Sequence, residues 1–179
     1  MKSDISTILV GAIHFVFTMV GAVLVDRLGR RILLLTSIIG VTTCTLALGT
    51  FFFLMDSGND VSNLSWLPLT SLSIFIITFA IGYGPITWLM VSEVYSKQLS
   101  VFFSPVTGFF NWMLVFIITF TFRPLTETIG TGPTFWIFTG ISVVGILFTF
   151  FVVPETKGKS MSEIQRMLSG EKNIDEQKT

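Results

Sequence analysis

The chain has 179 residues, of which 51% are hydrophobic and 12% are charged, and its mean hydropathy is +0.78. Soluble domains carry about 25% charged residues, so this composition excludes an ordinary soluble domain. The 11 basic and 11 acidic residues cancel, and this balance predicts neither a nucleic-acid partner nor an acidic substrate.

The charged residues are absent from five long apolar segments, at 5–25, 32–55, 66–91, 101–122 and 133–153. A helix needs about 20 apolar residues to cross a hydrocarbon core about 30 Å thick. A charge at the bilayer centre costs about 2.5–3.5 kcal/mol, so lipid would impose this exclusion. We therefore predict an all-α membrane protein in which residues 1–153 form five transmembrane helices.

A tight turn, Asp26-Arg-Leu-Gly-Arg-Arg31, follows the first segment. Gly29 lets the chain reverse, and Asp26 can either pair with the arginines or cap the next helix. A basic loop that only sets topology would explain the charges but not the order of the residues. The second segment holds the sole cysteine, Cys44. No disulfide within the chain is possible, and we expect a small buried side chain there.

A polar, acidic stretch from Asp56 to Ser65 separates the second and third segments, as expected of a turn between spans. It contains the glycosylation sequon Asn63-Leu-Ser65. The sequon ends next to the apolar Trp66. Because this places it close to the membrane, we do not expect glycosylation.

The third segment contains Gly82-Tyr-Gly-Pro-Ile-Thr-Trp88, which predicts a helix bent in mid-membrane. Pro85 removes a backbone donor, and the flanking glycines permit a bend. Transporters place substrate sites at bent or broken helices, where freed carbonyl groups can face a wet cavity. The indole of Trp88, just beyond the bend, offers a flat apolar face and one N–H group that suit the C–H surface of a sugar ring. The alternative is that Trp88 only packs within a kinked helix.

Residues 154–170 follow the last segment and begin Pro154-Glu-Thr-Lys-Gly-Lys-Ser160. Proline ends the helix, and we expect the lysines to face the cytoplasmic lipid surface. Ser160 to Glu163 predicts a capping box that starts a short amphipathic helix, with apolar positions at Met161, Ile164, Met167 and Leu168. Residues 171–179 are charged and lack aromatic side chains, which predicts a disordered tail.

The numbers of basic residues on the two sides of the predicted membrane are unequal. One side holds Arg27, Arg30, Arg31, Lys97, Lys157, Lys159, Arg166, Lys172 and Lys178, and the other holds only Lys2 and Arg123. The positive-inside rule places the first set in the cytoplasm. We therefore expect a multi-pass protein of the plasma membrane, with the N-terminus outside and the C-terminus in the cytoplasm.

Three stretches, taken in this order, resemble the sugar porter family of the major facilitator superfamily. They are the turn at 26–31, the bend followed by Glu93, and the stretch after Pro154. The pair Asn111-Trp112, which begins 18 residues after Glu93, is a further match. The similarity runs from about Ile5 to Gly170. The start of the first segment and the outer loop look most like the insect facilitated trehalose transporters.

The resemblance implies that the five spans correspond to helices 8–12 of a twelve-helix fold, which is incomplete here. In such a fold the sugar lies between two six-helix halves, and neither the N-terminal half nor helix seven is present in this sequence. The implied sugar-binding residues are His14, Gly84, Pro85, Trp88 and Asn111. The implied cytoplasmic gate residues are Asp26, Arg27, Arg30, Arg31 and Glu93. No cofactor and no metal ion are implied.

Several positions depart from the family pattern. His14 stands where an Asn or Gln usually faces the sugar, so it either bonds a sugar hydroxyl or bonds a neighbouring helix. Thr87 replaces the second proline of the bend, and Val115 a polar residue. Ser100 replaces an arginine that pairs with Glu93, so we expect Glu93 to reach one of the arginines of the first turn instead.

Two functions remain open. The first is a C-terminal fragment of a transmembrane sugar transporter, for trehalose or a glucose-like hexose, working by alternating access in its full-length form. The alternative is a truncated, non-transporting membrane protein that associates with or regulates an intact porter. The expected partners are a sugar substrate, membrane lipid, and either another porter chain or the N-terminal half. An enzyme is not expected, because no span carries a carboxylate and the sequence has no metal-ligand cluster.

Overall fold

The computed structural model describes residues 3–95, 97–159, 163, 164 and 166, and every regular element among them is a helix. The elements in order are α1 Ser3–Leu28, α2 Arg30–Asp56, the short 3-10 helix η1 Ser62–Leu64, α3 Leu67–Thr78, the π-helical turn η2 Phe79–Tyr83, α4 Gly84–Val94, α5 Lys97–Ile129 and α6 Thr131–Phe151.

Five helices of the described chain are long and apolar enough to cross a membrane. This confirms the predicted all-α architecture with five spans, the third of which is α3, η2 and α4 in succession. The helices run further than the apolar segments suggested. Asp26 and Arg27 lie in α1, so only Gly29, with φ of 93°, separates α1 from α2. Arg123 lies inside α5, where its Nε is 2.8 Å from Oε1 of Glu127 one turn later.

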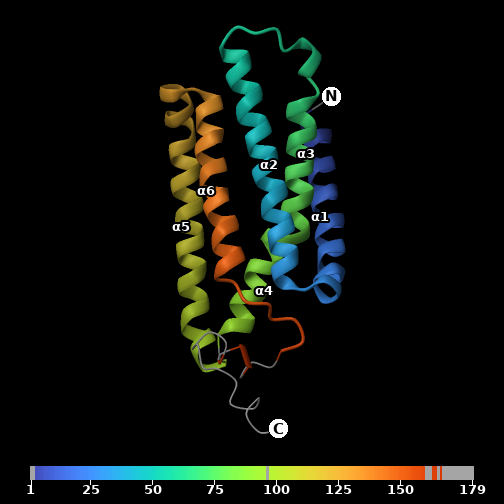
Figure 1. Cartoon of the computed structure of the whole chain (residues 1–179), viewed down its shortest axis with the longest axis vertical. Coiled ribbons are helices and arrows are strands. Elements are labelled where there is room, and N and C mark those ends of the chain that lie inside the picture. Colours follow the sequence, from blue (N-terminus) through green and yellow to red (C-terminus); the bar gives the residue numbers. More distant parts are fainter. Residues whose placement is uncertain (1–2, 96, 160–162, 165, 167–179) are drawn as a thin grey trace.

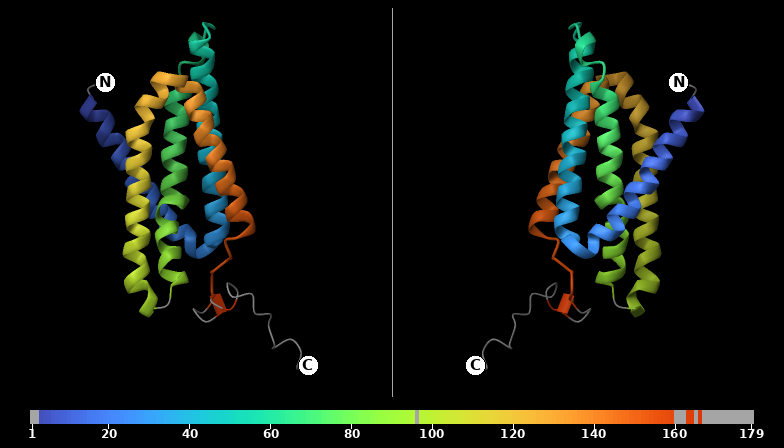
Figure 2. Two further views of the ribbon diagram at one scale, coloured as in Figure 1. Left: turned by 90° about the vertical axis from the view of Figure 1, so that its left-hand side faces the viewer. Right: turned by 90° about the vertical axis from the view of Figure 1, so that its right-hand side faces the viewer.

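The described helices form two sides around the third span (Figures 1 and 2). α2 and α6 lie on one side, the α3–η2–α4 span lies in the middle, and α1 and α5 flank it on the other side. α1 contacts the other helices at its C-terminal end and diverges from them toward its N-terminal end. No residue of the apolar window in α5 is buried. The side formed by α1, α4 and α5 is therefore open.

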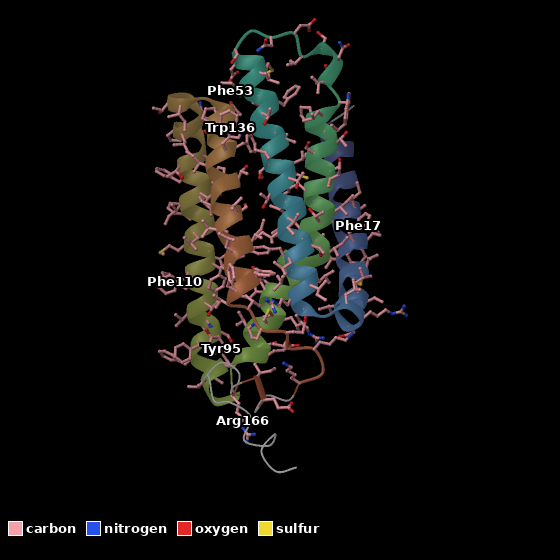
Figure 3. All side chains as sticks on the ribbon, viewed as in Figure 1. Phe17, Phe53, Tyr95, Phe110, Trp136 and Arg166 are labelled. Atoms are coloured by element: carbon pink, nitrogen blue, oxygen red, sulfur yellow. The ribbon has the colours of Figure 1, made fainter. Side chains whose placement is uncertain are left out.

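The seam between α2 and α6 is the most extensive contact of the fold. A Cβ on Gly49 of α2 would lie 2.6 Å from Cδ1 of Trp136 in α6, so the helices approach closely there. The rings of Phe53 and Trp136 meet one turn further, with centroids 4.9 Å apart (Figure 3). Deeper in the membrane the Thr139 hydroxyl donates to that of Thr45 over 3.1 Å. Small residues, aromatic contacts and an interhelical hydrogen bond are the usual means of holding membrane helices together.

The C-terminal predictions are only partly covered by the structure. Glu163 and Ile164 are helical, and Ile164 is buried. The other residues of the predicted capping box and most of the amphipathic helix lie outside the described residues, as does the tail at 171–179.

Candidate functional site

The predicted bend in the third span is built as a π-helical turn. The N–H group of Gly84 donates to the carbonyl of Phe79, five residues back, so the N–H group of Tyr83 lacks its usual helical acceptor. Ser37 of α2 fills the gap: its Oγ accepts from the Tyr83 N–H at 2.9 Å and donates to the Thr78 carbonyl at 2.6 Å. One serine thus hydrogen-bonds two backbone groups at the bend, where lipid offers no such partner.

The π turn is clamped by close backbone contacts from two helices. A Cβ on Gly82 would lie 2.5 Å from Cβ of Ser37, and a Cβ on Gly21 of α1 would lie 2.4 Å from the Ile81 carbonyl oxygen. Both distances are shorter than real side chains allow, so these positions require glycine. The bend is therefore held between α1 and α2, and α4 leaves it at a fixed angle.

The structure places the predicted sugar-binding residues on three helices. Gly84 and Pro85 start α4. Trp88 of α4 is 47% exposed and faces α5, because its Cη2 lies 3.9 Å from the Cβ position of Gly108. Asn111 is exposed and lies one turn beyond Gly108, on the same face of α5. Trp88 and Asn111 therefore border the same α4–α5 contact.

His14 is separated from that pair. It is exposed on α1, and Figure 1 shows α1 and α5 at opposite ends of the row of helices. Its carbonyl accepts from the Thr18 hydroxyl at 2.7 Å, but its ring makes no hydrogen bond to any residue that the structure describes. Of the two alternatives for His14, a bond to a neighbouring helix is thus not seen in the described chain.

A charged cluster joins three segments at the end of the bundle where α1 turns into α2. Nε and Nη2 of Arg30 lie 3.2 and 3.0 Å from Oε1 of Glu93 in α4. The other Glu93 oxygen accepts from the Thr156 hydroxyl at 2.6 Å. Thr156 is buried, and the side chains of Arg30 and Glu93 are 15% and 22% exposed. The expected contact between Glu93 and an arginine of the first turn is present, and Arg30 makes it. Asp26 lies at the edge of the cluster, 3.7 Å from Arg30 Nη2.

Glu155 caps α2, a role for which the sequence suggested Asp26. Its carboxylate oxygens accept from the backbone N–H groups of Arg30 at 3.0 Å and Arg31 at 3.2 Å. These are the first two N–H groups of α2, which have no partner within the helix, and the helix dipole favours a negative charge there. A Cβ on Gly29 would lie 2.7 Å from Oε2 of Glu155. Glycine at this position is therefore needed both for its positive φ and for the capping carboxylate.

Two further basic residues at this end of the bundle, Arg31 and Lys157, contact the protein. Arg31 donates to the Phe150 carbonyl at the end of α6, and its guanidinium carbon lies 5.6 Å from the centre of the Phe150 ring. Lys157 donates to the Arg27 carbonyl at 2.6 Å. The last carbonyl groups of α1 lack partners within the helix and attract a cation, and the Lys157 side chain stays exposed. The Arg27 side chain is exposed.

Sequence reasoning missed Ser37, Glu155 and Thr156 as members of these sites. The stretch after Pro154 was singled out, but only its proline and lysines received roles. Ser37 lies 46 residues before Tyr83, and no local pattern marks it.

Comparison with known proteins gives a consistent result. Residues 1–168 match the family described as Sugar (and other) transporter. Facilitated trehalose transporter Tret1 of Polypedilum vanderplanki is 45% identical over 170 residues, which are 95% of this chain and 34% of that protein. Tret1 of Anopheles gambiae is 42% identical over 170 residues, 95% of this chain and 21% of that protein. The chain thus spans between a fifth and about a third of these relatives.

The fold matches solved transporters over nearly the whole chain. The inward-open xylose transporter XylE from E. coli superposes with a TM-score of 0.78 and 27% identity, covering 90% of this chain and 35% of that one. A double-tryptophan mutant of XylE gives a TM-score of 0.75 and 26% identity, covering 92% and 34%.

Proposed function

Since the chain belongs to the sugar transporter family of the major facilitator superfamily, we propose that it is the C-terminal part of a transmembrane sugar transporter. The observation that carries the proposal is the π-helical bend with Trp88 beyond it, in a chain that matches the family over residues 1–168. Broken helices of this kind are where transporters bind substrate. Enzymatic activity forms no part of the proposal.

We propose that the sugar path runs along the open side formed by α1, α4 and α5. Trp88 presents its flat indole to the apolar face of a sugar ring, and Asn111 and His14 supply hydrogen bonds to hydroxyl groups. Gly84 and Pro85 set the direction of α4 and thereby the position of Trp88. The relatives named as trehalose transporters support trehalose or a glucose-like hexose as the substrate, and a second wall of the site would come from a further half of the transporter.

We propose that the cluster around Arg30 and Glu93 acts as a cytoplasmic gate. The pair ties the start of α2 to the end of α4, and Thr156 ties in the segment after α6, so the three move as one unit. Asp26, Arg27 and Arg31 add charge around this unit. The excess of basic residues at this end supports its cytoplasmic location, with the N-terminus outside and the protein in the plasma membrane.

Uptake of labelled trehalose and glucose by transfected cells tests the proposal. One set of cells expresses this chain, and a second set expresses a chimera in which this chain replaces the 170 matching residues of Polypedilum vanderplanki Tret1. We expect saturable uptake from the chimera and none from the chain alone, which provides one wall of the site. A chimera that reaches the cell surface and takes up neither sugar contradicts the assignment.

A second function rests on a specific difference at the gate. Ser100 stands where the family pattern has an arginine, and its hydroxyl contacts that of Ser104 at 3.0 Å and is not paired with Glu93. The chain would then associate with an intact porter and regulate it. Co-expression with Polypedilum vanderplanki Tret1, followed by native mass measurement, distinguishes the two functions. A stable complex with altered uptake favours regulation, and an unassociated chain opposes it.

A further inference from the structure

His14 is the only histidine of the chain, and none of the five apolar segments contains Asp, Glu, Lys or Arg. It lies in the part of α1 that is apolar enough to cross a membrane. Along the helix it is about 18 Å from Asp26, near the end of α1, so it lies well inside a hydrocarbon core about 30 Å thick. A histidine at such a depth is costly in lipid and usually faces a bundle interior or a water-filled path.

The face of α1 that bears His14 is the face that packs on the third span. Gly21 and Val25 follow His14 by 7 and 11 residues, which places both within about 20° of it around the helix. A Cβ on Gly21 would lie 2.4 Å from the Ile81 carbonyl oxygen, and Val25 is buried in one cluster with Ile86 of α4. Because α1 diverges from the other helices toward its N-terminal end (Figure 2), His14 is exposed in the opening between α1 and the third span.

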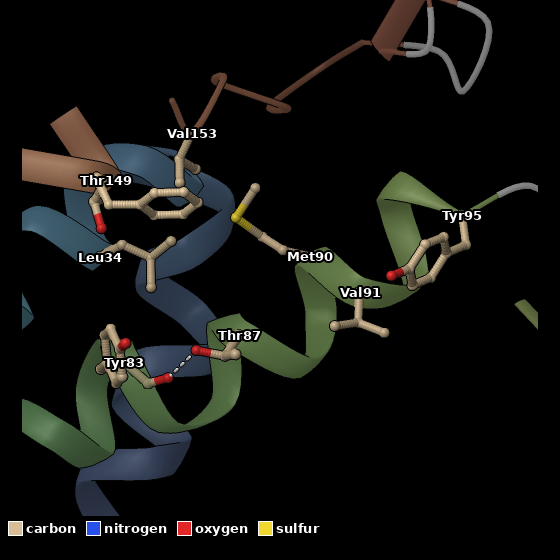
Figure 4. Close-up of a pocket in the computed structure, with 9 residues that line it drawn as sticks. Leu34, Tyr83, Thr87, Met90, Val91, Tyr95, Thr149 and Val153 are labelled. Atoms are coloured by element: carbon tan, nitrogen blue, oxygen red, sulfur yellow. Dashed lines mark hydrogen bonds between the residues drawn. The ribbon is translucent and has the colours of Figure 1, made fainter. Parts of the chain in front are cut away.

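No charged side chain of the described residues faces His14 across this opening. In the third span, Glu93 lies near the end of α4, where it pairs with Arg30. Tyr83 lines an apolar pocket of about 270 Å³ between α2, α4 and the end of α6 (Figure 4), and no residue of α1 lines that pocket. The other titratable side chains of α2 lie at its two ends or are buried within the fold: Arg31, Asp56 and Cys44. A proton on His14 therefore gains no carboxylate partner from these helices.

The two protonation states of histidine offer different hydrogen bonds to a sugar. A neutral imidazole has one N–H donor and one acceptor nitrogen, whereas the protonated ring has two donors, no acceptor and a charge. A sugar that displaces water from the protonated ring would bury this charge without a partner, which is costly. The sugar therefore binds the neutral form more tightly, and by linkage the sugar and the proton oppose each other's binding.

We propose that a proton on His14 inhibits sugar binding, so that acid lowers transport through this chain. The inference rests on the proposed function and adds to it the regulation of the same path. Sugar affinity is full at a pH above the range in which histidine ordinarily titrates, which is between about pH 5 and pH 8, and it is lost as the pH falls through that range. The family pattern has Asn or Gln at this position, and an amide takes up no proton there, so the sensitivity is particular to the histidine.

Uptake kinetics of the Tret1 chimera in proteoliposomes test the proposal. Labelled trehalose is supplied with the same buffer on both sides of the membrane, so that no proton gradient drives transport. We expect the KM to rise at least about threefold between about pH 7.5 and about pH 5.5, as it would if about two thirds of the His14 side chains carried a proton at the lower pH, with little change in the maximal rate. His14→Asn and His14→Gln keep a donor and an acceptor, so both should have a parent-like KM at the higher pH and the same KM at the lower one.

Moving the histidine by one residue tests whether its position on the helix matters. Phe15 is 63% exposed and lies about 100° around α1 from His14. A double variant that combines His14→Asn with Phe15→His turns the imidazole away from the third span, and its KM should not depend on pH.

Three results would overturn the inference while leaving the sugar assignment intact. They are a KM of the parent chimera that stays constant or falls in acid, a pH dependence that persists in both His14→Asn and His14→Gln, and a pH dependence that the double variant restores. A chimera that takes up no sugar at either pH, with or without the substitutions, overturns the proposed function and this inference with it.

Discussion

Replacing Ser37 with alanine should destabilise the fold more than its small size suggests. The side chain is buried, and its single oxygen serves the N–H group of Tyr83 and the carbonyl of Thr78, both in the third span. Alanine removes this oxygen and adds nothing that could clash. The Tyr83 N–H group cannot return to the Phe79 carbonyl without displacing the Gly84 N–H group that now occupies it. The variant therefore loses one hydrogen bond to each of two part-buried backbone groups.

The expected cost follows from those two groups. An unpaired buried donor or acceptor costs about 1–3 kcal/mol, but hydrogen bonds between membrane helices measure on average about 0.6 kcal/mol because the chain relaxes. We therefore expect Ser37→Ala to lower the free energy of unfolding by about 1–3 kcal/mol. Ser73→Ala is a matched control. Its hydroxyl donates only to the Leu69 carbonyl of its own helix, at 2.8 Å, and this carbonyl lies within the helical ladder, so the change should be under about 1 kcal/mol.

Equilibrium unfolding in mixed micelles with increasing SDS, followed by circular dichroism, measures both variants against the parent. We expect Ser37→Ala to shift the midpoint clearly further than Ser73→Ala. Equal shifts would refute the bridging role of Ser37, because the bridge would then add nothing beyond one ordinary hydroxyl contact.

Three further predictions concern the ends of the bundle. Glu93→Gln should reduce uptake by the Tret1 chimera several-fold, because Arg30 loses a part-buried charged partner; Glu127→Gln, whose partner Arg123 is 86% exposed, should not. Gly29→Ala should cost about 1–2 kcal/mol for its positive φ and more for displacing the capping carboxylate, so in SDS unfolding it should exceed Gly58→Ala, where φ is also positive but nothing lies within 4 Å; equal losses would contradict the cap. The hydrogen bonds from Ser62 lower the pKa of Asp60, so the turn that they form is fully present at a pH above the ordinary pKa of Asp and is lost as the pH falls through the lowered pKa. An NMR titration of Ser62→Ala should show a higher pKa for Asp60, and an unchanged pKa would contradict this cause.

The five spans were predictable from the sequence because lipid excludes charge from long segments, and this constraint acts residue by residue. The bend was predictable for a similar reason, since Pro85 has no N–H group wherever it stands. The form of the bend was not. The π turn depends on Ser37, whose role exists only once α2 lies beside the third span.

The gate shows a different limit. Its charged residues were identified, and the contact between Glu93 and an arginine of the first turn was expected. The role of Glu155 was not, because the N–H groups that it caps belong to a helix more than 120 residues away in the sequence. The contact of Lys157 was not predictable for the same reason: the carbonyl that binds it lies at the far end of the chain, in α1.

The central claim is that the open side bearing Trp88 lines a sugar path, and trehalose uptake by the chimera with Trp88→Ala tests it most directly. Trp66→Ala is the control, since Trp66 is also exposed, at 62%, but lies beside the outer loop. We predict that uptake falls at least about tenfold in Trp88→Ala, which corresponds to about 1.4 kcal/mol, and stays near the parent value in Trp66→Ala. Parent-like uptake by Trp88→Ala at equal surface expression would contradict the claim.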